Sequence, residues 1–307
     1  MHRHVLARGI AVASLIGLWA PAPSHAQPVN ESQFVAEYAA GLGARVVWGE
    51  DTVVDGSRIA TWGIVSNADD SILAAGVTFG MKIVQDMPAA VEGLPAGAFA
   101  SLQFPEVVRF PNTYFEHVEI QPEPNGHIIS PLDCYNYPTA NLNRNFVPHF
   151  DFHFYSIPQR EVLEILAPAI NPPLLLQPWD PRYPLLPAGY FRPGYSARLG
   201  AIIADMGRHS SPCTALDDPA PLSADMLAGF LPDASKMHFI EPMISQDRLL
   251  QGEDFELATP MPYDLESFGK SLGRPTLYPQ KFEARFLGTS WAMIFSDFKR
   301  VPFAPAQ

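Results

Sequence analysis

Short runs of alternating hydrophobic and polar residues, rich in aromatic and β-branched side chains, recur along this chain. Between them lie turn signals such as Val54-Asp55-Gly56, Pro124-Asn125-Gly126 and Leu287-Gly288-Thr289. Alternation with a period of two, interrupted by frequent turns, is typical of antiparallel β structure. The runs that predict strands are residues 45–48, 58–65, 72–84, 114–120, 146–157, 237–241 and 282–287. The pattern therefore predicts a mainly β fold, an antiparallel sandwich or barrel, with a cupin-like barrel as one form of it.

Local signals add one hairpin and a few short helices to this picture. Residues 281–287 and 290–298 flank Gly288-Thr289 and predict a β-hairpin. Hydrophobic residues recur at helical spacing in segments 31–42 and 159–166, and Asn30 is a suitable N-cap for the first. Segment 223–231 begins with a serine that can cap a helix, so it is a third predicted helix.

Proline is abundant, with 32 residues in a chain of 307. The densest stretch, residues 168–193, has too many prolines for a helix or a central strand. Its leucine and aromatic residues predict a long extended segment that packs on the sheet or at a subunit interface. We therefore expect residues 27–307 to form a single β-rich domain.

The most specific pattern is Pro148-His149-Phe150-Asp151-Phe152-His153-Phe154-Tyr155. Successive side chains of a strand point to opposite faces, so the three phenylalanines would line one face. His149, Asp151, His153 and Tyr155 would line the other. The phenylalanine face requires a hydrophobic core, whereas the other face gathers imidazole and carboxylate groups. These groups are the ligands that Zn²⁺, Fe²⁺ and Mn²⁺ use in proteins.

Strand geometry limits how many of these residues can bind one ion. Positions i and i+2 lie about 7 Å apart and can converge, whereas positions i and i+4 lie about 13 Å apart. We therefore expect at most two of His149, Asp151 and His153 in one site, unless a bulge bends the strand. The other ligands of such a site are expected among His117, Glu119, His127, His209 and Glu241.

Three interpretations of these residues stay open. The first is a bound divalent transition metal, although the ligand types do not distinguish Zn from Fe or Mn. The second is a structural hydrogen-bond network in which Asp151 fixes the tautomer of a histidine. The third is acid–base catalysis without a metal, by His153 with Asp151. No nucleophile stands out for it, and no P-loop or G-x-G-x-x-G motif indicates a nucleotide.

The first 26 residues have the features of a secretory signal peptide. Arg3 and Arg8 precede a hydrophobic stretch at 10–20, and Ser24-His25-Ala26 has small residues where signal peptidase cleaves. The stretch is shorter than the roughly 20 residues that span a bilayer. A membrane anchor is the alternative. Cleavage would leave a soluble periplasmic or secreted protein with no membrane span.

Charge limits the classes of binding partner, and the cysteine content predicts a disulfide. The net charge is −12 and no basic run occurs, which argues against nucleic acid or an anionic membrane as a partner. Export would expose the two cysteines, Cys134 and Cys213, to an oxidising compartment, so we predict that they form a disulfide. Joint metal ligation is the alternative, but neither lies in a C-x-x-C pair.

Several blocks occur in one order along the chain: LAAGVTFGM at 73–81, Gly93-Leu94-Pro95, His117-x-Glu119 with Gly126-His127, PHFDFHFY, Met206-Gly207-x-His209 and His238-x-x-Glu241-Pro242-Met243. With these blocks the chain resembles an uncharacterised family of exported bacterial proteins, a domain of unknown function. PHFDFHFY is the most specific block of the resemblance, which covers roughly residues 45–299. The resemblance implies mainly β structure, export and a histidine-rich face at the matching positions.

Taken together, these features favour an exported protein that binds a transition metal or a small polar ligand through a His/Asp/Glu cluster on a β-sheet. The second hypothesis is a metal-dependent enzyme of cupin-like type, an oxygenase, isomerase or hydrolase, in which the metal is a Lewis acid or activates water. The likeness to cupins is an architectural analogy. The third is a structural or assembly protein in which residues 168–193 pack between the subunits of a homo-oligomer.

Overall fold

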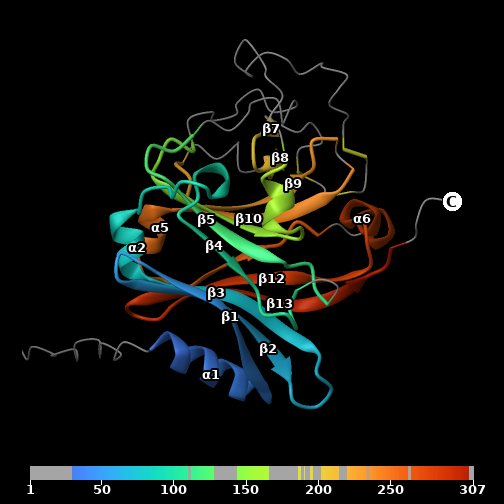
Figure 1. Cartoon of the computed structure of the whole chain (residues 1–307), viewed down its shortest axis with the longest axis horizontal. Helices are drawn as coiled ribbons and strands as arrows, with labels where there is room; N and C mark the ends of the chain where they lie inside the picture. The colour runs from blue at the N-terminus through green and yellow to red at the C-terminus, as the bar shows by residue number, and fades with distance from the viewer. Residues whose placement is uncertain are drawn as a thin grey trace, which may run out of the picture.

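Two antiparallel β-sheets, one of six strands and one of seven, pack face to face as a sandwich in the computed structural model (Figure 1). The predicted mainly β fold is confirmed, and of the two predicted architectures the sandwich is the one observed. The structure describes residues 30–109, 112–127, 144–165, 186–187, 190, 194–195, 202–213, 220–233, 235–261 and 264–303.

The six-stranded sheet contains the first and the last strand of the described chain. Its strands, in spatial order, are β1 (Ala44–Val54), β2 (Ser57–Ser66), β3 (Ile72–Gly80), β13 (Ser290–Val301), β12 (Thr276–Phe286) and β11 (Phe255–Ala258). Strands β12 and β13 form the predicted hairpin, in which Phe286 pairs with Trp291 around the turn at Gly288. The β1–β2 hairpin closes through Asp55 and Gly56, both with positive φ, as a two-residue turn of the type that suits twisted strands.

The seven-stranded sheet carries the histidine-rich strand near its middle. Its strands, in spatial order, are β4 (Ala100–Gln103), β5 (His117–Glu123), β6 (His149–Tyr155), β10 (Met237–Ser245), β9 (Ala224–Phe230), β8 (Gly207–Ser210) and β7 (Ile202–Ile203). Neighbouring strands are antiparallel throughout both sheets. Strands that lie far apart in the sequence are therefore neighbours on the two sides of β6.

The helices of the described residues are short and lie around the two sheets (Figure 1). They are α1 (Glu31–Gly41), α2 (Met81–Asp86), the 3₁₀ turn η1 (Pro95–Gly97), α3 (Gln159–Val162), α5 (Gln246–Leu250) and α6 (Leu265–Leu272). The predicted N-cap of α1 is confirmed, because the Asn30 side chain accepts a hydrogen bond from the Ser32 amide at 2.9 Å. None of these helices is long and apolar enough to cross a membrane.

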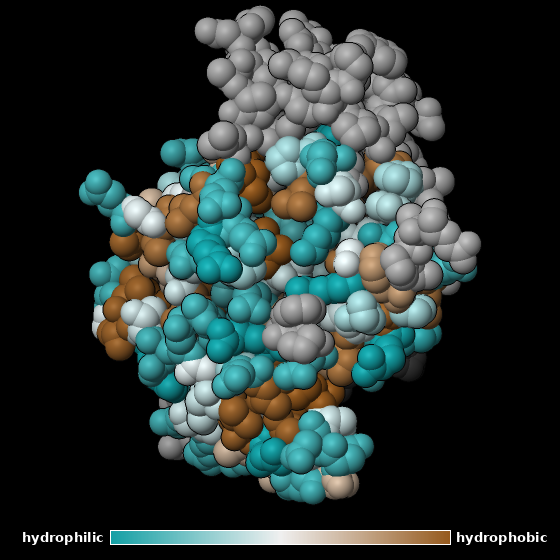
Figure 2. Space-filling model, turned by 45° about the vertical axis from the view of Figure 1, so that its right-hand side comes forward, coloured by the Kyte–Doolittle hydropathy of each residue, from teal (hydrophilic) through white to brown (hydrophobic). Residues whose placement is uncertain are grey.

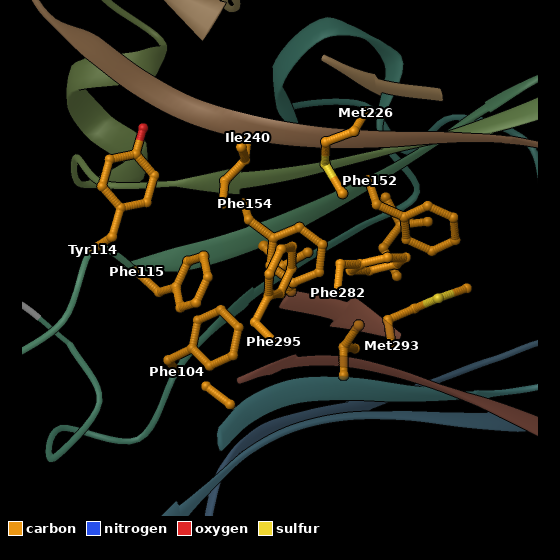
Figure 3. Close-up of a cluster of buried hydrophobic side chains, with 14 of the residues drawn as sticks. Phe104, Tyr114, Phe115, Phe152, Phe154, Met226, Ile240, Phe282, Met293 and Phe295 are labelled. Atoms are coloured by element: carbon orange, nitrogen blue, oxygen red, sulfur yellow. The ribbon is translucent and has the colours of Figure 1, made fainter. Parts of the chain in front are cut away.

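The main hydrophobic core fills the space between the two sheets. Phe150, Phe152 and Phe154 of β6 all point into it, as their alternation predicted. Figure 3 shows Phe152 and Phe154 facing Phe282 and Phe295 of the opposite sheet. The ring centroids of Phe154 and Phe295 are 4.7 Å apart. The core thus fixes which face of β6 is apolar and turns its polar residues to the outer face of the seven-stranded sheet.

A second, smaller core lies on the other side of the six-stranded sheet. There α1 buries Val35 and Ala39 against Trp62, Ile64 and Ile294 of that sheet. On the molecular face in Figure 2, hydrophilic residues predominate and hydrophobic ones form separate groups. Hydrophobic burial is therefore concentrated between the sheets and beneath α1.

The predicted helix 223–231 is wrong, because this segment forms strand β9. It pairs with β10 on one side and β8 on the other. Met226, Ala228 and Phe230 face the main core, while Leu227 packs with Met243 on the outer face. A strand that is buried on both faces has hydrophobic residues at most positions, so periodicity alone does not distinguish it from a helix.

Two further predictions are wrong in length. The strand predicted over 72–84 ends at Gly80, where the Met81 amide turns to donate to the Thr289 carbonyl at 2.8 Å and α2 begins. The helix predicted over 159–166 is helical only over Gln159–Val162. The Ile165 carbonyl accepts from the Asp205 amide at 2.9 Å, so the chain leaves the helix before that residue.

Several sequence predictions concern residues outside the described part of the chain. These are the signal peptide at 1–26, Cys134 and most of the Pro-rich segment at 168–193, including its predicted subunit contact. The disulfide between Cys134 and Cys213 therefore stays a prediction. Leu186, one of the few described residues of the Pro-rich segment, is buried in the main core.

Candidate metal centres

Strand β6 places four polar side chains on the outer face of the seven-stranded sheet. His149, Asp151, His153 and Tyr155 alternate with the three core phenylalanines, and each is no more than 2% exposed. A buried carboxylate and buried imidazoles are costly unless they are paired or bind a cation. What surrounds these side chains therefore decides what they do.

The first group of possible ligands consists of His127, His149 and Asp151, here called the Asp151 set. The two carboxylate oxygens of Asp151 face different rings: Oδ2 lies 3.4 Å from His127 Nε2, and Oδ1 lies 3.4 Å from His149 Nε2. His149 and Asp151 come from the same strand, two positions apart. His127 comes from the turn after β5, where Gly126 has φ +61° and the His127 amide donates to the Asn145 carbonyl at 3.2 Å.

The second group consists of His153, His209 and Glu241, here called the Glu241 set. Glu241 Oε2 lies 3.7 Å from His153 Nε2 and 3.4 Å from His209 Nε2. Glu241 belongs to β10, beside β6, and His209 belongs to β8, two strands further across the sheet. The intervening strand has Gly229 opposite both His209 and Phe239. The absence of a side chain there leaves room for the Phe239 ring, which would overlap a Cβ atom.

The two sets fit the coordination chemistry of a divalent transition metal. Each offers two imidazole nitrogens and one carboxylate oxygen, all within 4.8 Å of one another. A tetrahedral site with bonds near 2.1 Å separates its ligand atoms by about 3.4 Å, close to the distances observed here. Three protein ligands leave a coordination position for water or another molecule, as in catalytic zinc sites and in iron sites with two histidines and a carboxylate.

Four of the ligand atoms are buried without a hydrogen bond from any described residue. They are His149 Nε2, Asp151 Oδ1, His153 Nε2 and Glu241 Oε2. Buried polar atoms are normally hydrogen-bonded, so an atom without a partner needs an explanation such as an ion. Other buried side-chain atoms, such as the Tyr155 hydroxyl, also lack a partner among the described residues, but each of these four faces another ligand atom of its own set.

The imidazoles of the Glu241 set are in the form that a metal needs. Burial lowers the pKa of His153 to about 4 and that of His209 to about 3. Both rings are therefore neutral at pH 7, and only a neutral imidazole has a nitrogen lone pair free to bind a cation.

The two carboxyl groups are shifted in opposite directions. Burial would raise the pKa of Asp151, but the charges of His149 and His127 outweigh it and hold that pKa below its usual range. Burial raises the pKa of Glu241 well above its usual range, and the Asp151 charge raises it further. Binding of a cation at the Glu241 set is therefore coupled to loss of a proton from Glu241.

Two other predicted ligands, His117 and Glu119, lie on the same outer face but belong to neither set. They pair with each other, His117 Nε2 lying 3.1 Å from Glu119 Oε1. The His117 ring also stacks on Tyr155, with centroids 4.9 Å apart. Glu119 is opposite His153 in the β5–β6 register, so this pair borders the Glu241 set without contributing to it.

The division into two sets was not foreseen from the sequence, which predicted one cluster. The predicted limit of two β6 ligands in one site agrees with the structure, because His149 and Asp151 join one set and His153 joins the other. Sequence reasoning missed the residues that position the ligands. The Val147 carbonyl lies 2.8 Å from His149 Nδ1, and Gly229 makes room for Phe239 between β8 and β10. A backbone carbonyl has no signal in a sequence, whereas a glycine inside a strand does indicate a close approach.

Comparison with known proteins gives no relative for this site. No family model matches the chain, and no curated protein or solved structure matches it significantly. What the two sets can do is therefore inferred from their own geometry and chemistry.

Proposed function

We propose that this protein binds divalent transition-metal ions at the Asp151 set and at the Glu241 set. The observation that carries the proposal is that each set brings two imidazole nitrogens and one carboxylate oxygen within 4.8 Å of one another, with four of these buried atoms making no hydrogen bond to described residues. A purely structural polar network is expected to satisfy such atoms. Two imidazoles and one carboxylate per set form a donor group that suits Zn²⁺, Fe²⁺ or Mn²⁺.

Elemental analysis of protein purified without chelators tests this proposal. We expect stoichiometric metal in the wild type and less in Asp151→Asn and Glu241→Gln, each of which removes the carboxylate of one set. Tyr155→Phe is the matched control, because Tyr155 lies on the same strand and face and its hydroxyl makes no hydrogen bond to described residues. Folded protein that retains no metal, and takes up none when it is added, would contradict the proposal.

Catalysis is a second candidate, favoured by the three protein ligands in each set. An oxygenase, isomerase or hydrolase needs a coordination position that its substrate or a water can occupy. The His127 and His209 side chains are 41% and 15% exposed, so each set has one ligand within reach of solvent. In cobalt-substituted protein, azide should change the visible spectrum if that position is open. An unchanged spectrum would favour a closed, structural site.

We also propose that the protein is exported and acts in the periplasm or outside the cell. The supporting observations are the charged, hydrophobic and small-residue segments within residues 1–26. Mass spectrometry of the protein from its native host should find a mature chain that begins at Gln27. A chain that keeps residues 1–26 would contradict cleavage.

A further inference from the structure

The Asp151 set and the Glu241 set are neighbours on one face of one sheet. Asp151 belongs to the first and His153 to the second, and these residues are two positions apart on β6. Same-face neighbours on a strand are about 7 Å apart. In the β6–β10 register, Met243 pairs with Asp151 and Phe239 with Tyr155, so Glu241 lies beside His153.

Loading both sets with divalent cations would place two net positive charges close together. Each set has only one carboxylate, which leaves one positive charge on each bound ion. The carboxylates of β5, Glu119 and Glu123, are hydrogen-bonded to His117 and Gln121 and belong to neither set. Because the pair is buried, solvent screens this repulsion weakly. An anion that binds both ions would relieve it.

Solvent access to the two sets and the free coordination position on each ion also favour an anion that binds both ions. Each set has three protein ligands, so each ion keeps a position for an exogenous atom. The partly exposed rings of His127 and His209 give each position a route to solvent. A tetrahedral oxyanion has several oxygens, which allows it to occupy the free positions of two ions at once.

We propose that the two sets act as a single two-ion centre that binds an oxyanion, the class of a phosphate or phosphate ester, between its ions. This inference rests on the proposed metal binding and deepens it, because it states how the two ions cooperate and what they bind. Its signature is reciprocal coupling: the anion strengthens binding of the second ion, and the second ion strengthens binding of the anion.

Zinc titration against a chromogenic chelator, with and without inorganic phosphate, tests the coupling. In the wild type we expect two ions, the second weaker than the first, and phosphate should strengthen the second by about tenfold or more. Asp151→Asn and Glu241→Gln should each bind one ion, with an affinity that phosphate hardly changes. Tyr155→Phe should behave as the wild type.

The possible outcomes separate this inference from the proposed function. Two ions whose affinities ignore phosphate, or a single ion per wild-type chain, would overturn the two-ion centre and leave metal binding intact. No ion at all would overturn both. If Asp151→Asn does not fold, His127→Gln replaces it, because the His127 side chain is 41% exposed and is less important for packing.

Discussion

The His149 imidazole illustrates how one candidate ligand is held in place. Its Nδ1 donates a hydrogen bond to the Val147 carbonyl at 2.8 Å, so the neutral ring has its lone pair on Nε2. That nitrogen faces Asp151 Oδ1 at 3.4 Å and makes no hydrogen bond to described residues. Metal-binding histidines commonly have such a carbonyl partner on the other nitrogen.

His238 is a contrasting case, since its Nε2 donates to the Met206 carbonyl at 2.6 Å and it belongs to neither set. Burial lowers its pKa to about 3, despite the Met206 hydrogen bond, and positive charge on Lys236, His153 or His117 lowers it further. Between pH 6.5 and 3 the unfolded chain therefore binds more protons at this residue than the folded one does. Stability must then fall as the pH falls through this range.

We predict that His238→Gln, whose amide can replace the donor to Met206, makes the metal-free protein less sensitive to acid. The slope of unfolding free energy against pH should decrease by up to about 1.4 kcal/mol per pH unit. Urea denaturation from pH 7 to pH 4 measures it. His153 and His209 contribute equally to the pH profiles of the wild type and of His238→Gln. The difference between the two profiles therefore reports His238 alone. Parallel profiles would show that His238 does not titrate as described.

At the scale of elements, the Asp151 set depends on the turn after β5. Gly126 has φ +61°, and a Cβ atom there would overlap the Asn145 carbonyl oxygen. Gly126→Ala is therefore predicted to displace His127 and weaken metal binding at the Asp151 set by about tenfold or more, leaving the Glu241 set unchanged. Chelator competition measures both affinities.

The control for this variant is Gly56→Ala, in the turn between β1 and β2. Gly56 also has a positive φ, +79°, but a Cβ atom there would have no neighbour within 4 Å. It introduces similar backbone strain in the other sheet, so both metal affinities should stay at wild-type values. Equal losses in the two variants would mean that general destabilisation, and not the position of His127, is responsible.

The Glu241 set depends in a similar way on strand β9. A side chain at Gly229 would overlap the Phe239 ring, whose centroid is 5.1 Å from that of His209. We predict that Gly229→Ala moves Phe239 and His209 and weakens the Glu241 set alone. Titration of the variant with zinc should show wild-type affinity for the ion at the Asp151 set and a lowered affinity for the ion at the Glu241 set. Wild-type affinity for both ions would contradict this role of Gly229.

Elements whose signal is local were predictable from the sequence. The alternation in PHFDFHFY determines which β6 residues face the core, and Asp55-Gly56 determines a tight turn. Which residues complete each set depends instead on strand order, which brings side chains of β8 and β10 close to those of β6 on the outer face of the sheet. Residue types alone could not separate His117 and Glu119, which pair with each other, from the residues that complete the two sets.

The whole molecule links the two candidate metal sites to stability through the sandwich core. The same strand supplies three candidate ligands on one face and three core phenylalanines on the other. Unfolding β6 would therefore disrupt both sets and the main core together. A ligand that binds only the folded state must then stabilise the whole fold.

We predict that zinc raises the melting temperature of the metal-free protein and that a chelator reverses the effect. A free concentration one hundred times the dissociation constant contributes about 2.7 kcal/mol for each independent site. Differential scanning calorimetry measures the shift, which should be smaller in Asp151→Asn and in Glu241→Gln than in Tyr155→Phe. A melting temperature that does not respond to zinc would contradict the coupling of metal binding to the fold.

The most direct test of metal binding is anomalous X-ray diffraction at a metal absorption edge, from crystals of protein purified without chelators. We expect two anomalous peaks on the outer face of the seven-stranded sheet. One should lie among His127, His149 and Asp151, and the other among His153, His209 and Glu241. Well-ordered crystals that show no peak at either position, even after soaking in zinc, would contradict metal binding at the two sets.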